Sequence, residues 1–134
     1  MNPLPAKDAA ARAYELFNLI TFTIGAKVSD TINVAVKLLG ARGEALGRPG
    51  LCKVYLSDVN TGIGITATGT TSALAIGTNG AILSTPVSGK MVEVVSNAAG
   101  LFDLNVIQTA GGTNYYMVVE MPDGSIVVSS EISF

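Results

Sequence analysis

Most of the chain alternates between apolar and polar positions with a period of two. From residue 20 onward, segments rich in Val, Ile, Thr and Tyr recur about every ten positions, separated by Gly, Pro, Asn and Asp. This pattern is typical of half-buried strands joined by turns. It predicts seven to nine strands, at residues 20–24, 32–38, 53–57, 90–96, 101–108, 115–121 and 125–134, with three further candidates at 63–68, 74–76 and 81–83.

The same alternation assigns each side chain to a face, because successive residues of a strand point to opposite sides of the sheet. The adjacent Tyr115 and Tyr116 should therefore separate, one into the core and the other onto the surface. We expect a core made of the apolar positions that share a face, namely Ile32, Val34, Val36, Leu38, Val54, Leu56, Val92, Val94, Phe102, Leu104, Val106, Met117, Val119 and Met121.

The connections favour antiparallel pairing. The turns at residues 97–100 and 122–124 are short enough to close hairpins between the strands that flank them. Parallel neighbours need a crossover of about a dozen residues or more, usually helical, and the pattern after residue 20 holds none. Residues 20–134 are therefore predicted to form an all-β, antiparallel β-sandwich.

The first residues follow a different pattern. Residues 6–19 contain no Gly or Pro and are rich in helix-forming residues, which predicts an amphipathic helix and an N-terminal helical arm at residues 1–19. Its apolar face carries Tyr14, Phe17 and Ile20. This face either caps the domain core or docks on a partner, and we assign the three residues as candidate partner-binding residues.

Charge is scarce in this chain. Only 13% of residues are charged, about half of the ~25% usual in soluble domains, and the net charge is −2. Without a basic stripe, we expect no nucleic-acid partner. The charge-free run at residues 59–89 is interrupted by Gly, Pro, Ser and Thr, so we expect no membrane span. Residues 1–7 lack the pattern of a secretory signal. Something besides water is expected to cover part of this surface.

The residues that usually carry catalysis are missing or scattered. The chain has no histidine, which removes the commonest general base and most zinc sites. Its single cysteine, Cys52, lies at the mouth of a predicted strand beside Leu51 and Val54, where we expect an inert thiol. Acidic residues fall in turns or on outward strand positions expected to be solvated: Asp58, Glu93, Asp103, Glu120 and Asp123.

One acidic segment has the spacing of a metal loop. Residues 58–62 read Asp-Val-Asn-Thr-Gly, as at the start of a calcium loop, but no further acid follows until Glu93. We therefore interpret this segment as a polar turn. Together, these observations predict a protein that is not an enzyme and has no catalytic residues, cofactor or metal.

Several segments carry a family resemblance. Residues 32–38, 41–46 and 54–58 are similar to bacterial immunoglobulin-like modules. The segments Ala-Ile-Gly-Thr-Asn-Gly at 75–80, Val-Val-Ser at 94–96, and 116–129 resemble small structural proteins of tailed bacteriophages, a similarity that spans residues 20–134.

The resemblance implies an immunoglobulin-like head decoration (cement) protein. Such a protein would be made in the host cytoplasm, bind the major capsid protein on the outer face of the virion and stabilise the shell, with a homo-oligomer as a further option. A tail, baseplate or fibre module is an alternative. From a different class, a carbohydrate-binding or adhesin domain is also open, although the absence of Trp argues against it.

Overall fold

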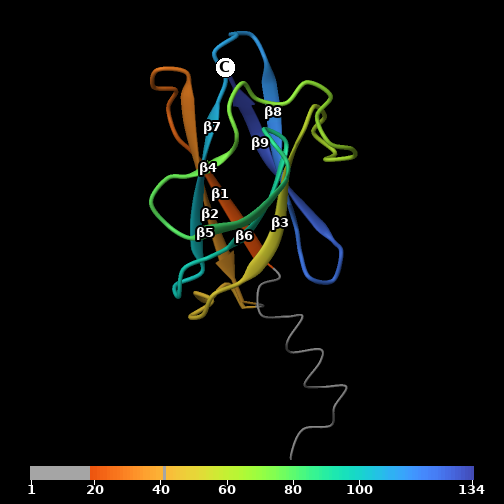
Figure 1. Cartoon of the computed structure of the whole chain (residues 1–134). Helices are drawn as coiled ribbons and strands as arrows, with labels where there is room; N and C mark the ends of the chain where they lie inside the picture. The colour runs from red at the N-terminus through yellow and green to blue at the C-terminus, as the bar shows by residue number, and fades with distance from the viewer. Residues whose placement is uncertain (1–18, 41) are drawn as a thin grey trace, which may run out of the picture.

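The computed structural model describes residues 19–40 and 42–134, and this part of the chain contains nine strands (Figure 1). No helix occurs in this part, and the predicted N-terminal helix lies outside it. The strands are β1 (Leu19–Ile24), β2 (Thr31–Leu39), β3 (Leu51–Ser57), β4 (Ala75–Ile76), β5 (Ala81–Val87), β6 (Met91–Val95), β7 (Leu101–Ile107), β8 (Asn114–Glu120) and β9 (Ile126–Ser133).

The strands form two antiparallel sheets packed face to face, which confirms the predicted β-sandwich. Sheet A has the order β1-β2-β7-β4, and sheet B has the order β5-β6-β3-β8-β9. Read as immunoglobulin strands, β1-β2-β7-β4 follow the A-B-E-D order of a constant-type domain and β3-β8-β9 follow its C-F-G order. β6 and β5 extend sheet B beyond β3. Seven of the nine strands therefore follow the order of a constant-type immunoglobulin sandwich, and β5 and β6 are additional to it.

The core lies between the two sheets, where alternation placed it. Val34 and Leu104 of sheet A and Val54 and Val119 of sheet B are 0% exposed. Every residue predicted to face inward is buried except Met121, which is partly buried against the core. Tyr115 is fully buried whereas its neighbour is only partly so, which confirms the separation of the two tyrosines.

The turn at residues 97–100 is a correction to the sequence prediction. It reverses the chain tightly, with Asn97 N donating to Leu101 O (2.9 Å) and Gly100 N donating to Asn97 O (3.0 Å). However, β6 belongs to sheet B and β7 to sheet A, so the predicted hairpin does not form. Each strand has one apolar face. Because the chain crosses from sheet B to sheet A at this turn, the apolar faces of β6 and β7 both point into the core between the sheets. The hairpin across residues 122–124 is confirmed, because β8 pairs with β9.

The candidate strand at residues 63–68 is also wrong, because these residues belong to the long connection between β3 and β4. Gly62, Gly64 and Gly69 there have φ values of +73°, +85° and +73°. That conformation interrupts an extended strand and suits a loop. Two shorter candidates, at 74–76 and 81–83, do contribute strands, as β4 and the start of β5.

A buried tyrosine fixes this connection to the sandwich. Tyr115, at the start of β8, donates from its hydroxyl to Gly69 O (2.5 Å) and accepts from Gln108 Nε2 (2.6 Å). Tyrosines at the start of strand F often bind the backbone a few residues upstream. Here the hydroxyl instead binds a residue far away in the sequence, so it anchors the loop at residues 58–74.

Candidate partner-binding surfaces

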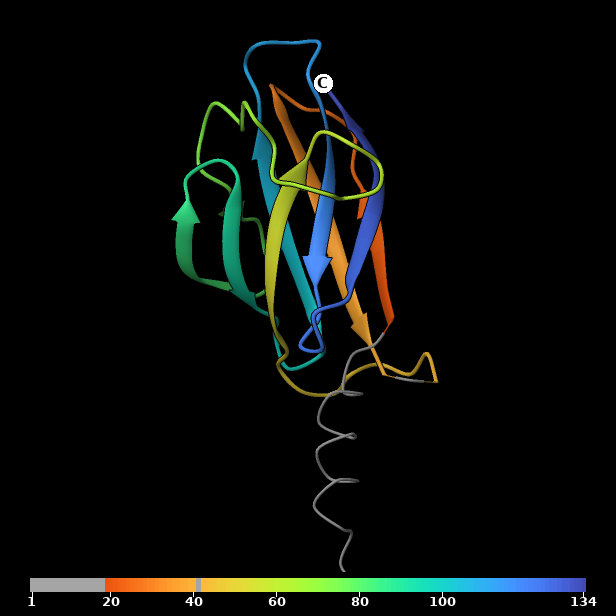
Figure 2. The ribbon, with the colours of Figure 1, turned by 90° about the vertical axis from the view of Figure 1, so that its right-hand side faces the viewer.

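The first candidate surface is formed where the loop at residues 58–74 crosses in front of β8 and β9 (Figure 2). Gly62 touches the sheet so closely that a Cβ atom there would lie 2.7 Å from Val128 Cγ2 and 3.1 Å from Val118 Cγ2. The Tyr55 hydroxyl donates to Gly62 O (2.6 Å) and holds the backbone down. As a result, Val118 is fully buried although it points away from the core.

This close approach leaves a group of apolar side chains facing water. We call Val59, Ile63, Ile65 and Ile126 the apolar cap, and their exposure ranges from 39% at Ile126 to 77% at Ile63. Gly62 lies beside two of them: its N–H donates to Val59 O (3.1 Å), and a Cβ at this position would lie 3.2 Å from Ile126 Cδ1. Ile63 follows it directly in the sequence. Grouped apolar side chains on a protein surface mark sites of interaction.

The loop under the cap is held by an acidic residue at its base. Asp58 accepts from Ala67 N–H (3.0 Å) and from Thr66 Oγ1 (2.5 Å), and these two hydrogen bonds hold the pKa of its carboxyl below the usual value. Lys90 Nζ donates to Ala67 O (2.9 Å). The carboxylate is thus engaged within the loop. Across residues 19–40 and 42–134, no cluster of His, Cys, Asp or Glu has the arrangement of a metal site.

The second candidate surface lies on the outer face of sheet A, and it corrects a prediction. Asp103, expected to be solvated, is only 5% exposed because the segment after β4 covers it. Its carboxylate accepts from the backbone N–H groups of Asn79 (2.6 Å) and Thr78 (2.9 Å) and from Asn33 Nδ2 (2.7 Å). A side chain at Gly77 would overlap Asp103 Oδ2.

These hydrogen bonds decide the charge state of Asp103. Desolvation by burial alone would raise the pKa of its carboxyl, but the donors from Asn79, Asn33 and Thr78 together outweigh it and hold the pKa below the usual value. Asp103 therefore stays ionised at neutral pH. The sheet keeps a charged group under the connection between β4 and β5.

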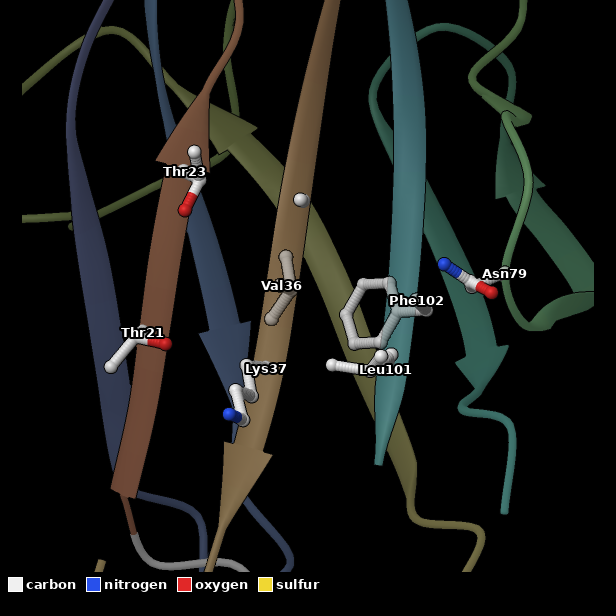
Figure 3. Close-up of a pocket in the computed structure, with 8 residues that line it drawn as sticks. Thr21, Thr23, Val36, Lys37, Asn79, Leu101 and Phe102 are labelled. Atoms are coloured by element: carbon white, nitrogen blue, oxygen red, sulfur yellow. The ribbon is translucent and has the colours of Figure 1, made fainter. Parts of the chain in front are cut away.

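Beside this network, the outer face of sheet A is hollowed by about 200 Å³ (Figure 3). Thr21 and Thr23 of β1 form one side, and Leu101 of β7 with Asn79 forms the other. The small side chain of the central strand, Ala35, lies between them, opposite Thr23 on one neighbour and Asp103 on the other. Lys37, one position further along this face of β2, also lines the hollow.

Of the three residues assigned from the sequence, only Ile20 lies in the described part of the chain. It lies in β1 opposite Leu38 and packs partly against the core. Tyr14 and Phe17 lie outside the described residues, so their contact with a partner stays a prediction.

Sequence reasoning missed both candidate surfaces. A usable signal for the cap was the Gly-Ile-Gly-Ile run at residues 62–65 in a charge-free segment.

Cys52 lies on the inner face of β3 and is 4% exposed. Burial raises the pKa of its thiol to about 12, so almost none of it is thiolate at neutral pH. This state is the one expected for a thiol that packs in the core and does not react.

Neither the comparison with protein-family models nor the comparison with curated proteins finds a match to this chain. Within the described ranges, no helix has the length and apolar character needed to cross a membrane.

Proposed function

We propose that this chain is a structural virion protein, a head decoration (cement) protein of a tailed bacteriophage that attaches to the outer capsid surface. The observation that carries this proposal is the apolar cap, a group of exposed aliphatic side chains fixed on a charge-poor sandwich. Residues 20–134 resemble small structural proteins of tailed phages, and this resemblance is the reason for proposing that the cap is covered in the virion. Tyr14 and Phe17 are proposed to add to the attachment.

The cap suits a modest contact that is repeated many times. Burying a fully exposed aliphatic side chain contributes about 1.5–3 kcal/mol, so a few such residues offset only part of the entropy lost on association. A protein that binds the assembled lattice and not its dissociated subunits nevertheless stabilises the lattice by mass action. Because residues 59–89 carry no charge, covering them desolvates no ionised side chain of this segment.

Copy number separates this function from the alternative of a tail, baseplate or fibre module. Purified virions would be analysed by quantitative gel densitometry, with the major capsid protein as the internal standard. A decoration protein is expected at a number comparable with that of the capsid subunits. A number typical of a tail tip or fibre would support the alternative, and absence from the particle would overturn both.

A further inference from the structure

We propose that the hollow on the outer face of sheet A binds a carboxylate, the side chain of an Asp or Glu residue of a partner protein. This site lies on the opposite sheet from the apolar cap and does not depend on the head decoration function. The proposal rests on the polar groups that line the hollow, on the way its wall is held, and on its size.

The polar side chains around the hollow are donors. Lys37 supplies an ammonium group, and within the described ranges it has no ion-pair partner. Thr21 and Thr23 supply hydroxyls. Asn79 Oδ1 already accepts from Asn97 Nδ2 (3.2 Å), and its amide nitrogen points towards β7 (Figure 3). An ammonium, an amide N–H and hydroxyls match a group that only accepts hydrogen bonds and carries negative charge.

The wall formed by Asn79 is fixed before any ligand arrives. Asp103 accepts from the backbone N–H of Asn79, and Asn97 holds its side chain. Burying a carboxylate costs free energy unless its oxygens accept hydrogen bonds. Asp103 is buried on the outer face of sheet A, and its oxygens accept such bonds. Its oxygens are engaged by Thr78, Asn79 and Asn33, so they do not compete with a ligand for the donors of the hollow. Such preorganisation lowers the entropy lost on binding.

The size of the hollow limits the ligand to one side chain. Its volume of about 200 Å³ is below the range of about 300–1,000 Å³ in which drug-sized molecules bind. Space exists because Ala35 lies at the centre of the face, where a larger residue would fill it. A single Asp or Glu side chain that projects from a partner surface fits both the chemistry and the space.

The test is a nuclear magnetic resonance titration of the full ¹⁵N-labelled chain with N-acetyl-glutamate amide, with N-acetyl-glutamine amide as the neutral control of the same shape. We expect shifts confined to the amides around Thr21, Ala35, Lys37 and Asn79 for the glutamate compound, with a millimolar dissociation constant that weakens at higher salt. No shift, shifts elsewhere, or equal shifts with the glutamine compound would overturn the proposal.

Two variants make the assignment specific. Lys37→Met removes the charge and Ala35→Leu fills the hollow, and each is expected to abolish the glutamate-induced shifts. Lys53→Met, which removes an exposed lysine of β3 in sheet B, is the matched control and should leave them unchanged. Persistence of the shifts in Lys37→Met would show that the hollow does not recognise the carboxylate. This experiment uses no virions, so its failure is separate from a failure of the decoration function.

Discussion

The two outer faces of the sandwich are both covered by the same stretch of chain, residues 58–80, yet by different physical means. On sheet A, the segment at 77–79 is held by hydrogen bonds to the ionised carboxylate of Asp103. On sheet B, the part of the loop that lies over the sheet, around Gly62, is held by contact between Gly62 and the side chains of Val118 and Val128, with a hydroxyl bond from Tyr55 to Gly62 O.

The two faces therefore present different chemistry to a partner. Hydrogen bonds are directional, so the cover on sheet A fixes individual donor atoms around a small hollow. Apolar contact is not directional. On sheet B, Gly62 packs against the side chains of Val118 and Val128, and the neighbouring Ile63 is exposed. Sheet A is therefore suited to recognising one polar group, and sheet B to covering a broad apolar area.

The largest effect is expected from Asp103→Asn, which breaks the polar cover of sheet A. An amide has one acceptor oxygen, so its NH2 group would face either the backbone N–H of Asn79, which bonds Oδ1, or the Nδ2 of Asn33, which bonds Oδ2. One of these donors loses its partner, and we expect a loss of about 2–3 kcal/mol in the free energy of unfolding at pH 7. Urea unfolding monitored by circular dichroism measures it. Asp30→Asn, in an exposed turn, should change stability by less than about 0.5 kcal/mol.

Asp103→Asn should also change how the free energy of unfolding depends on pH. The pKa of Asp103 is lower in the folded chain than its ordinary value of 3.8, so its contribution is complete above pH 3.8 and is lost as the pH falls through the folded-state pKa. The wild type should therefore lose stability below pH 3.8, and Asp103→Asn should lose less. The variant keeps part of the slope because Asp58 and Asp123 also have lowered pKa values. Equal slopes would contradict the role given to Asp103.

When the apolar cover of sheet B is disturbed, the stability difference between two glycine variants is expected to be somewhat smaller than the effect of Asp103→Asn. Gly62→Ala and Gly64→Ala both place a side chain at positive φ, which costs about 1–2 kcal/mol in either case. Only at Gly62 would the new Cβ also collide with Val128 and Val118, whereas at Gly64 nothing lies within 4 Å. Gly62→Ala should therefore be less stable than Gly64→Ala by roughly 1–3 kcal/mol in thermal or urea unfolding. Equal stabilities would show that the loop does not press on the sheet.

The inward faces of the strands could be predicted from the sequence, but the cover on their outward faces could not. Alternation correctly placed Val34, Val54 and Leu104 in the core, because the direction of a strand side chain depends only on its neighbours in sequence. It could not reveal what lies on the outward side. The burial of Asp103 depends on Asn33, 70 positions away, and on Thr78, 25 positions away, and that of Val118 depends on Gly62.

Pairing across the turn at residues 97–100 failed for a related reason. The turn residues specify a chain reversal, and the hydrogen bonds between Asn97 and Leu101 show that it occurs. Whether the next strand joins the same sheet depends on which neighbours compete for its edges. β7 pairs with β2 and β4, both of which lie far from it in the sequence.

The smallest effect on stability is expected at the cap itself. Ile63→Ser removes a side chain that is 77% exposed, so the free energy of unfolding should change by less than about 0.5 kcal/mol. If the cap is the docking face, affinity for undecorated heads in a co-sedimentation assay should fall by about one to two orders of magnitude. Val28→Ser, at a residue that is 68% exposed and lies in the connection between β1 and β2, is the matched control and should bind normally. Equal binding of the two variants would remove the cap from the interface.

We propose that this sandwich decorates a phage head through the apolar cap on sheet B, and cryo-electron microscopy of purified virions would show where the chain lies. We expect density for the sandwich on the outer face of the capsid, with sheet B towards the shell and Ile63 buried against the major capsid protein. Density for the chain only in the tail, its absence from the particle, or a head-bound sandwich whose Ile63 loop faces solvent would contradict it.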